Sequence, residues 1–257
     1  LAYAMGDGEA LRSGAAAQAL LARTLAAGAT RPDGVAAALW ESILFPYVDG
    51  AVFAAAVGAG PTWAGLDAAY LAPPLSTEQI LHPERYTERD VPTWLAFEAR
   101  PPSEWRRTIV DVLGEQYGRS VLAQVLTGVV TESAVARALE GWDGDRMELW
   151  SHGVDRDVIV WAHVWDSVDD ADAFQRVAER LSVPWAATAV VGTAAGDHGA
   201  ATWAEGTGGV LWTERWGDLT LVVADRGGDA TAAERWAVVD GVVRDAWRTL
   251  SRSEHPP

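Results

Sequence analysis

The five histidines of this chain are the residues whose spacing most directly tests for metal chemistry. A catalytic zinc normally takes three protein ligands and a water, often with two histidines at positions i and i+4 of one helix and a nearby glutamate as base. No two histidines of the sequence have that spacing: they are His82, His152, His163, His198 and His255. We therefore expect no zinc cofactor to be supported by this chain alone.

His82 lies in a short segment with acidic neighbours, because Glu78 precedes it and Glu84 follows it. An enzyme site here would require His82 and Glu78 to converge in one cleft with Asp7 or Glu9. The structural alternative is that His82 anchors a turn through hydrogen bonds, the commoner role for a histidine in a short capped helix. The sequence favours the structural role.

Two other histidines have weaker signals. His163 alternates with Trp161 and Trp165, which could form a small aromatic pocket but favours a half-buried histidine with a backbone partner. His198 follows Asp197 between glycines, where a solvated turn is favoured over a metal or base. The run Asp143-Gly144-Asp145 lacks the ligand spacing of a calcium loop, so we expect a turn entering a strand.

Composition excludes several classes of function. The chain has no cysteine, and its twenty cationic side chains are all arginine, which rules out thiol and lysine chemistry. The net charge of −16 argues against nucleic acid or an anionic membrane surface as partner. No uninterrupted apolar run reaches the roughly 18 residues of a membrane span. The fourteen tryptophans fall mostly within apolar periodicities and indicate a core.

The first part of the chain is expected to be helical. Helices are predicted at about 2–27, 34–58 and 62–71, with a kink near Phe45 caused by Pro46. Ser76 should cap a short helix, with Gln79 at the capping-box position. An extended connector around 94–97 and helices at about 114–125 and 132–140 complete this part.

After Gly141 the pattern changes to strands. A hairpin is expected from 147–150 and 158–165, then a helix capped by Ser167, then strands at about 184–192, 200–204, 208–216 and 219–224. Thr231 and Glu234 should open the last helix. The fold class is therefore α+β: an N-terminal helical region, residues 1–140, followed by an antiparallel sheet domain with covering helices, residues 141–257.

Three segments resemble one bacterial family of uncharacterised, often secreted proteins that are similar to zinc metallopeptidases. The most specific is Leu75-Ser76-Thr77-Glu78-Gln79-Ile80-Leu81-His82-Pro83-Glu84-Arg85-Tyr86, which Leu44-Phe45-Pro46-Tyr47-Val48-Asp49-Gly50 precedes in the family's order. The second is Asp7-Gly8-Glu9-Ala10, similar to the family's Glu-Gly-Asp-Ala. The third is Gly141-Trp142-Asp143-Gly144-Asp145-Arg146, with Trp165-Asp166-Ser167 and Ala171-Asp172-Ala173-Phe174 after it.

The resemblance implies a zinc site whose HExxH helix would precede Leu1. Asp7 would occupy the place of the third ligand, one methylene shorter than the family's glutamate, and Glu9 would be the adjacent supporting acid. Zinc is then possible only with an upstream segment, either lost by processing or truncation or absent from a degenerate member. Without it we expect an inactive, pseudoenzyme-like scaffold.

The alternative function is a non-catalytic binding or structural subunit that uses the scaffold and the tryptophan-rich sheet domain as an interaction surface. Its partner would be another protein or the missing N-terminal fragment, with no nucleic acid and no membrane span. The resemblance suggests a bacterial secreted or cell-envelope location.

Overall fold

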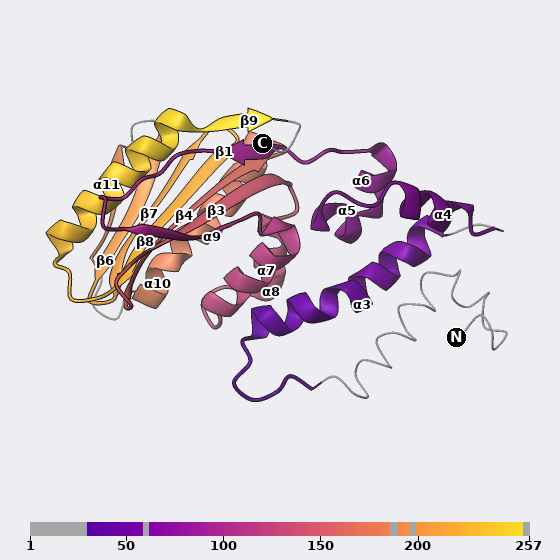
Figure 1. Cartoon of the computed structure of the whole chain (residues 1–257), viewed down its shortest axis with the longest axis horizontal. Helices are drawn as coiled ribbons and strands as arrows, with labels where there is room; N and C mark the ends of the chain where they lie inside the picture. The colour runs from indigo at the N-terminus through magenta and orange to yellow at the C-terminus, as the bar shows by residue number, and fades with distance from the viewer. Residues whose placement is uncertain (1–29, 59–61, 186–189, 196–198, 254–257) are drawn as a thin grey trace. The chain divides into compact units, whose positions relative to one another are not determined.

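The computed structural model describes residues 30–58, 62–185, 190–195 and 199–253. The chain divides into two compact units, 1–91 and 92–257. The sequence instead places the change of character at Gly141; residues 92–140 belong with the sheet, because they supply strands and covering helices to it. The α+β class itself, with a helical region before an antiparallel sheet, is confirmed (Figure 1).

The first unit, which we call the helical unit, contains four helices in its described residues: α3 (Ala37–Val57), α4 (Ala64–Leu71), α5 (Thr77–Leu81) and α6 (Pro83–Glu88). Helix α3 continues through Pro46, so the kink expected near Phe45 is not a break in the helix. Phe53 of α3 packs edge-on against Tyr86, with ring centroids 5.2 Å apart. This contact joins α3 to α6.

Helix α3 is the one described helix whose length and composition would allow it to cross a membrane. It carries Glu41 and Asp49, and its Phe45 and Phe53 are buried. Most of α3 is at least partly exposed, and one such helix is weak evidence for a membrane span.

The second unit, the sheet unit, is built on a seven-stranded antiparallel sheet in the order β2-β3-β4-β8-β7-β6-β5. Its strands are β2 (Arg106–Asp111), β3 (Trp142–His152), β4 (Arg156–Trp165), β5 (Val190–Ala195), β6 (Ala200–Gly206), β7 (Gly209–Trp216) and β8 (Leu219–Gly227). A small second sheet pairs β1 (Trp94–Ala96) with β9 (Ser251–Ser253). The helices are α7 (Gly114–Val125), α8 (Glu132–Ala138), α9 (Val168–Ala178), a 3-10 turn (Glu179–Leu181), α10 (Ser182–Trp185) and α11 (Ala232–Thr249).

Both faces of the large sheet are covered, which makes the unit three layers deep (Figure 1). Alternate residues of β4 point to opposite faces, as the pleat of a strand requires. Val158 and Val160 pack under α11, whereas Trp161 and Trp165 pack under α7, α8 and α9. We call these the α11 face and the α9 face.

The strong local signals of the sequence are confirmed. Ser167 caps α9 through the amide of Asp170, and Thr231 with Glu234 forms the capping box of α11. Helix α7 has the bounds expected, and the turn at Gly217 joins β7 to β8. The strand expected at 184–192 is wrong in its first part, because Ser182–Trp185 is a helical turn and β5 begins at Val190.

His163 differs from its expected setting. It is fully buried in the α9 face, where its ring stacks on Trp165 and contacts Trp161 and Phe174 at an angle, rather than half-buried with a backbone partner. Its Nδ1 lies 3.3 Å from the hydroxyl of Thr220, and within the described part of the chain its Nε2 has no hydrogen-bond partner. Burial lowers the pKa of His163 to about 3, because a charged imidazole would lose its hydration there.

This setting makes the stability of the sheet unit depend on pH. The native imidazole stays neutral between pH 6.5 and 3, while the unfolded one binds a proton below about 6.5, so stability falls as the pH falls through that window. The loss from this residue alone is about 2 kcal/mol at pH 5 relative to pH 8. We expect His163→Phe to retain that amount at pH 5, with a change of less than ~1.5 kcal/mol at pH 8.

Denaturant unfolding followed by tryptophan fluorescence measures this, since only Trp40 and Trp63 lie before the sheet unit. His152→Phe, a change at an exposed histidine, is the matched control and should lose stability with acid as the native protein does. Equal acid losses in the native protein and His163→Phe would contradict the assignment.

Candidate functional site

The signature segment 75–86 folds into a tight corner between α4 and the end of the helical unit. Ser76 Oγ accepts a hydrogen bond from the Gln79 amide at 3.2 Å, which starts α5. The Gln79 side chain, 3% exposed, accepts from the Leu75 amide at 2.8 Å and donates to the Asp90 carbonyl. It therefore bridges the two ends of the corner, whereas a capping box would return it to the amide of Ser76.

An arginine of the signature joins two carboxylates in this corner. Arg85 Nη1 lies 2.5 Å from Asp90 Oδ2, and its Nε lies 3.9 Å from Glu78 Oε1. The carboxylate of Glu78 is buried, with 2% of the side chain exposed. The guanidinium compensates the charge of this carboxylate pair and so stabilises the corner.

The other two candidates from the sequence do not complete a catalytic set with Glu78. His82 forms the junction of α5 and α6, and its Nδ1 lies 3.7 Å from the carboxylate of Glu84, which is 66% exposed. A zinc ion requires three ligand atoms about 2 Å from one centre. Among the described residues, Glu78, His82 and Glu84 do not form a group of ligand atoms close enough to hold one ion.

The remaining sequence candidates cannot be placed. Asp7 and Glu9, the expected third ligand and its support, lie outside the described residues, as do His198 and His255.

A groove of about 680 Å³ lies beside the corner in the helical unit. Its apolar wall comes from the end of α3, from α4 and from the segment after α4, and its polar residues come from α5, α6 and the turn after α6. The lining residues are Ala56, Val57, Gly65, Ala68, Ala72, Pro73, Leu75, Gln79, Tyr86, Thr87, Arg89 and Val91. A volume of this size is typical of a small-molecule site.

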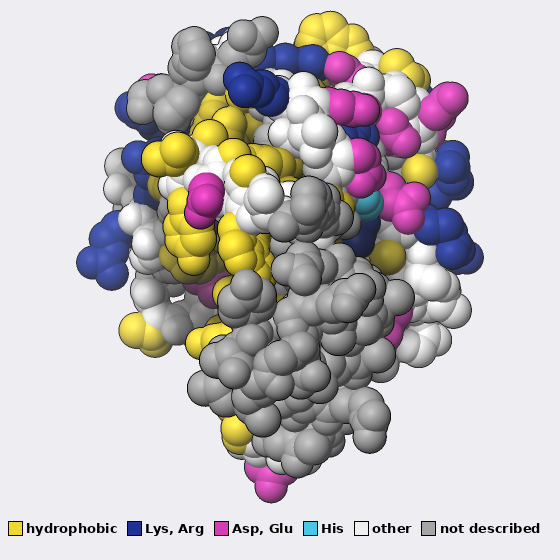
Figure 2. Space-filling view, turned by 90° about the vertical axis from the view of Figure 1, so that its right-hand side faces the viewer, with side chains coloured by type: hydrophobic (Ala, Val, Ile, Leu, Met, Phe, Trp, Pro, Cys, Tyr) yellow, Lys and Arg dark blue, Asp and Glu magenta, His cyan; other side chains and the backbone are white. Residues whose placement is uncertain are grey.

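The apolar wall depends on small side chains at the crossing of α3 and α4. A Cβ on Gly65 would lie 1.9 Å from the carbonyl oxygen of Val57, so the two helices could not approach this closely with any other residue there. Leu75, which lines the groove, is 60% exposed, and Tyr70 and Leu71 at the end of α4 are each 88% exposed. Figure 2 shows hydrophobic side chains on this end of the molecule.

Three of the four polar groups in the groove are already used by the backbone. Gln79 bridges the corner, Tyr86 donates to the carbonyl of Ala72 at 2.8 Å, and Thr87 donates to the carbonyl of Pro83 at 3.0 Å. The guanidinium of Arg89 makes no hydrogen bond or ion pair with any described residue. Arg89 is therefore the group of the groove that is available to a ligand.

The backbone of Arg89 is unusual as well. It caps α6 with φ 60° and ψ 42°, and among described residues it is the one non-glycine residue with positive φ. This position at the end of a helix is usually glycine or asparagine, and other residues cost about 1 kcal/mol there. The sequence contained a signal for it: α6 must end before Pro92, yet no glycine follows Glu88.

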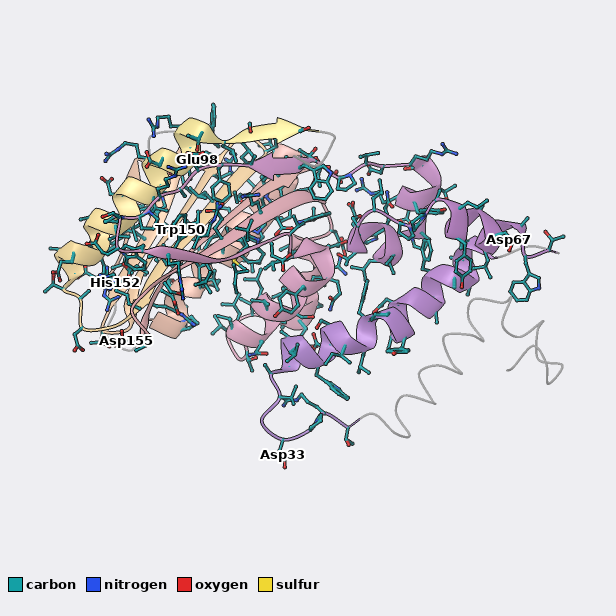
Figure 3. All side chains as sticks on the ribbon, viewed as in Figure 1. Asp33, Asp67, Glu98, Trp150, His152 and Asp155 are labelled. Carbon is teal, nitrogen blue, oxygen red and sulfur yellow. The ribbon has the colours of Figure 1, made fainter. Side chains whose placement is uncertain are left out.

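The sheet unit has a smaller cavity, of about 320 Å³, lined by Glu98, Ala99, Arg100, Arg107 and Trp150 (Glu98 and Trp150 are labelled in Figure 3). Both of its arginines are already paired. Arg100 lies 3.1 Å from Glu98, and Arg107 lies 3.1 Å from the fully buried Glu148. The cavity thus offers a ligand less uncompensated charge than the groove does.

Asp145, expected in a turn, instead lies within β3 and is fully buried. Its carboxylate accepts four hydrogen bonds, from the indole N–H groups of Trp142 and Trp161 and from the backbone amides of Leu113 and Gly114. Burial raises the pKa of Asp145, and these four donors oppose the rise. All four donors come from its own unit, so Asp145 fixes the start of α7 and shows no catalytic geometry.

The chain is similar to one described family and, distantly, to solved structures. A family model described as Domain of unknown function (DUF8575) matches residues 106–238. No curated protein matches the chain. The extracellular domain of PknH from Mycobacterium tuberculosis is similar over 62% of this chain and 87% of that chain, at 12% identity and a TM-score of 0.32. A similarity this low supports no inference about fold, location or activity.

The bridging role of Gln79 can be tested directly. Gln79→Ala removes two hydrogen bonds and leaves the Leu75 amide and Asp90 carbonyl without their partner, at a cost of about 2 kcal/mol. We expect hydrogen exchange of the Leu75 amide to accelerate by about 30-fold. Glu84→Ala, at the exposed side of the same corner, is the control and should change exchange little. Unchanged exchange in Gln79→Ala would show that the bridge does not hold the corner.

Proposed function

The chain belongs to the family described as Domain of unknown function (DUF8575), and from that premise we propose that it is a non-catalytic binding protein whose helical unit takes a small amphiphile. The ligand has an apolar body, which lies against the wall formed by α3 and α4, and an anionic group, which pairs with Arg89. The groove lies outside the residues that the family model matches, so ligand binding there is separate from the function of the matched domain.

The observation that carries this proposal is the left-handed backbone of Arg89 together with its available guanidinium. An arginine in a left-handed backbone conformation costs stability that glycine would not, and such strain is often retained where a side chain has a function. The same side chain is the polar group of the groove without a described partner, and an anion bound there would gain a charge-assisted hydrogen bond. A carboxylate at the end of an alkyl chain satisfies both halves of the groove.

Arg89→Gly separates binding from stability. Glycine removes the strain, so we expect the variant to unfold at the same temperature as the native protein or higher. Binding of decanoate, measured by displacement of a fluorescent fatty acid, should weaken by more than ~10-fold, because a charge-assisted bond is worth about 1.5–3 kcal/mol. Decanol, which has the same apolar body without the charge, should bind both proteins equally.

Arg180→Ala removes an exposed arginine from the sheet unit and is the control for net charge. It should bind decanoate as the native protein does. Equal affinity of Arg89→Gly and the native protein for decanoate, or no binding of decanoate by either, would overturn the proposal.

The metallopeptidase-like scaffold is the second candidate. It is favoured by the corner, where Ser76, Gln79, Arg85 and Tyr86 of the signature all make contacts within the helical unit. A scaffold role explains why a segment similar to a peptidase would keep its shape with no ligand set among Glu78, His82 and Glu84. The secreted or cell-envelope location implied by the resemblance is part of this proposal.

Elemental analysis of the purified full-length protein, including any segment upstream of Leu1, tests the second candidate. If the scaffold holds a catalytic zinc, about one zinc ion per chain is expected, lost on chelation together with peptide cleavage. Asp7→Ala, the expected third ligand, should then lower the zinc content. A metal-free protein that folds normally and cleaves no peptide would exclude the enzyme and leave the binding protein.

A further inference from the structure

Strand β2 (Arg106–Asp111) forms one end of the large sheet and, among the described strands, pairs only with β3. All six of its residues are exposed, including Ile109 and Val110 at 43% each. The outer edge of such a strand presents a row of backbone N–H and C=O groups able to pair with another strand. Proteins usually cover or disrupt such an edge, and an exposed one can pair with a strand of another chain.

A bulge at Thr108 shifts the register of this strand. Arg107 is opposite Trp150 and Ile109 is opposite Leu149, so Thr108 is the extra residue. Its hydroxyl donates to the Leu149 carbonyl at 3.1 Å, which holds the bulge against β3. The five other residues keep regular alternation on either side of it.

The pairing with β3 shows which face each side chain occupies. Arg107 and Val110 are opposite Trp150 and Glu148, which in turn face Val158 and Val160 of the α11 face. Arg106, Ile109 and Asp111 therefore point to the α9 face. In an unbroken strand Arg106 and Asp111 would point to opposite faces, and the bulge is what brings them to the same one.

With Thr108 outside the register, the strand is self-complementary. We propose that β2 pairs antiparallel with β2 of a second copy of this chain, about a two-fold axis that passes through Ile109. Each Ile109 is then opposite its own copy, Arg106 is opposite the second copy's Asp111, and Arg107 is opposite the second copy's Val110. A two-fold axis in an antiparallel pair must pass through a residue opposite itself, and this register satisfies that condition on both faces.

Charge and apolar contact both favour a second copy as the occupant. On the α9 face the pair has two Arg106–Asp111 contacts flanking an Ile109–Ile109 contact, and opposite charges and apolar residues directly across strands stabilise a sheet. On the α11 face Arg107 is held by Glu148, so its charge is already compensated beside Val110. A single six-residue edge buries little area and each chain carries −16 charges, so the dimer should be weak and dependent on concentration.

The absence of cysteine from the chain gives a direct test of the register. Ile109→Cys in the full chain places the only two thiols of the dimer opposite each other, at a Cβ separation of about 5 Å that a disulfide can close. Under mild oxidation we expect it to form a covalent dimer at least tenfold faster than Val110→Cys, whose exposure is the same, or Val154→Cys, which is in the β3–β4 turn. Equal rates for the three variants would overturn the proposal.

A charge exchange tests the same register without oxidation, by sedimentation of the full chain over a range of concentrations. Arg106→Asp and Asp111→Arg should each weaken the native dimer by at least tenfold, because each places like charges opposite one another. The double variant restores the pairs and should return the dimer. A native protein that stays monomeric at every concentration, or single variants that dimerise normally, would overturn the proposal, as would a monomeric double variant whose melting temperature equals that of the native protein.

Discussion

The hydrogen bond from an indole N–H to a buried carboxylate is the interaction on which the sheet unit most depends. A carboxylate taken out of water costs several kcal/mol unless donors replace its hydration. Five tryptophans supply such donors to three buried carboxylates: Trp142 and Trp161 to Asp145, Trp150 to Glu148, and Trp212 and Trp247 to Glu214; Trp236 donates likewise to the half-buried Glu205. Indole is suited to this role, because its ring fills the core while its single N–H donates.

These carboxylates also determine where the covering helices dock. Asp145 holds the first amides of α7, and Glu214 holds Trp247 of α11 at 2.8 Å. Asp225 on β8 binds Arg235 of α11 at 2.7 Å and Arg156 of β4 at 2.5 Å. Each is a strand residue that reaches a helix or a neighbouring strand, so the polar contacts fix positions that hydrophobic packing alone would leave less defined.

How far the sequence predicted this structure depended on whether the signal was local. Helix α7 was predicted from apolar periodicity, and α9 and α11 from periodicity together with capping residues, because these signals lie within one segment; the paired strands with the helices then gave the α+β class. Asp145 was assigned to a turn because Asp-Gly-Asp is a turn pattern, and its four donors come from positions that only the fold brings together. Strand β2 was not predicted, since the bulge at Thr108 removes the alternation that identifies a strand.

The candidate site shows the same division. The Ser76 cap could be predicted, but the long bridge of Gln79 and the exposed charge of Arg89 could not, because both depend on contacts made or lacking in three dimensions. Most polar groups of the two units are satisfied internally, through the corner of the helical unit or the indole and arginine donors of the sheet unit. Against this background of internal bonding, two features of the described residues stand apart: an arginine in a strained conformation beside an apolar groove, and the outer edge of β2, which pairs with no described strand.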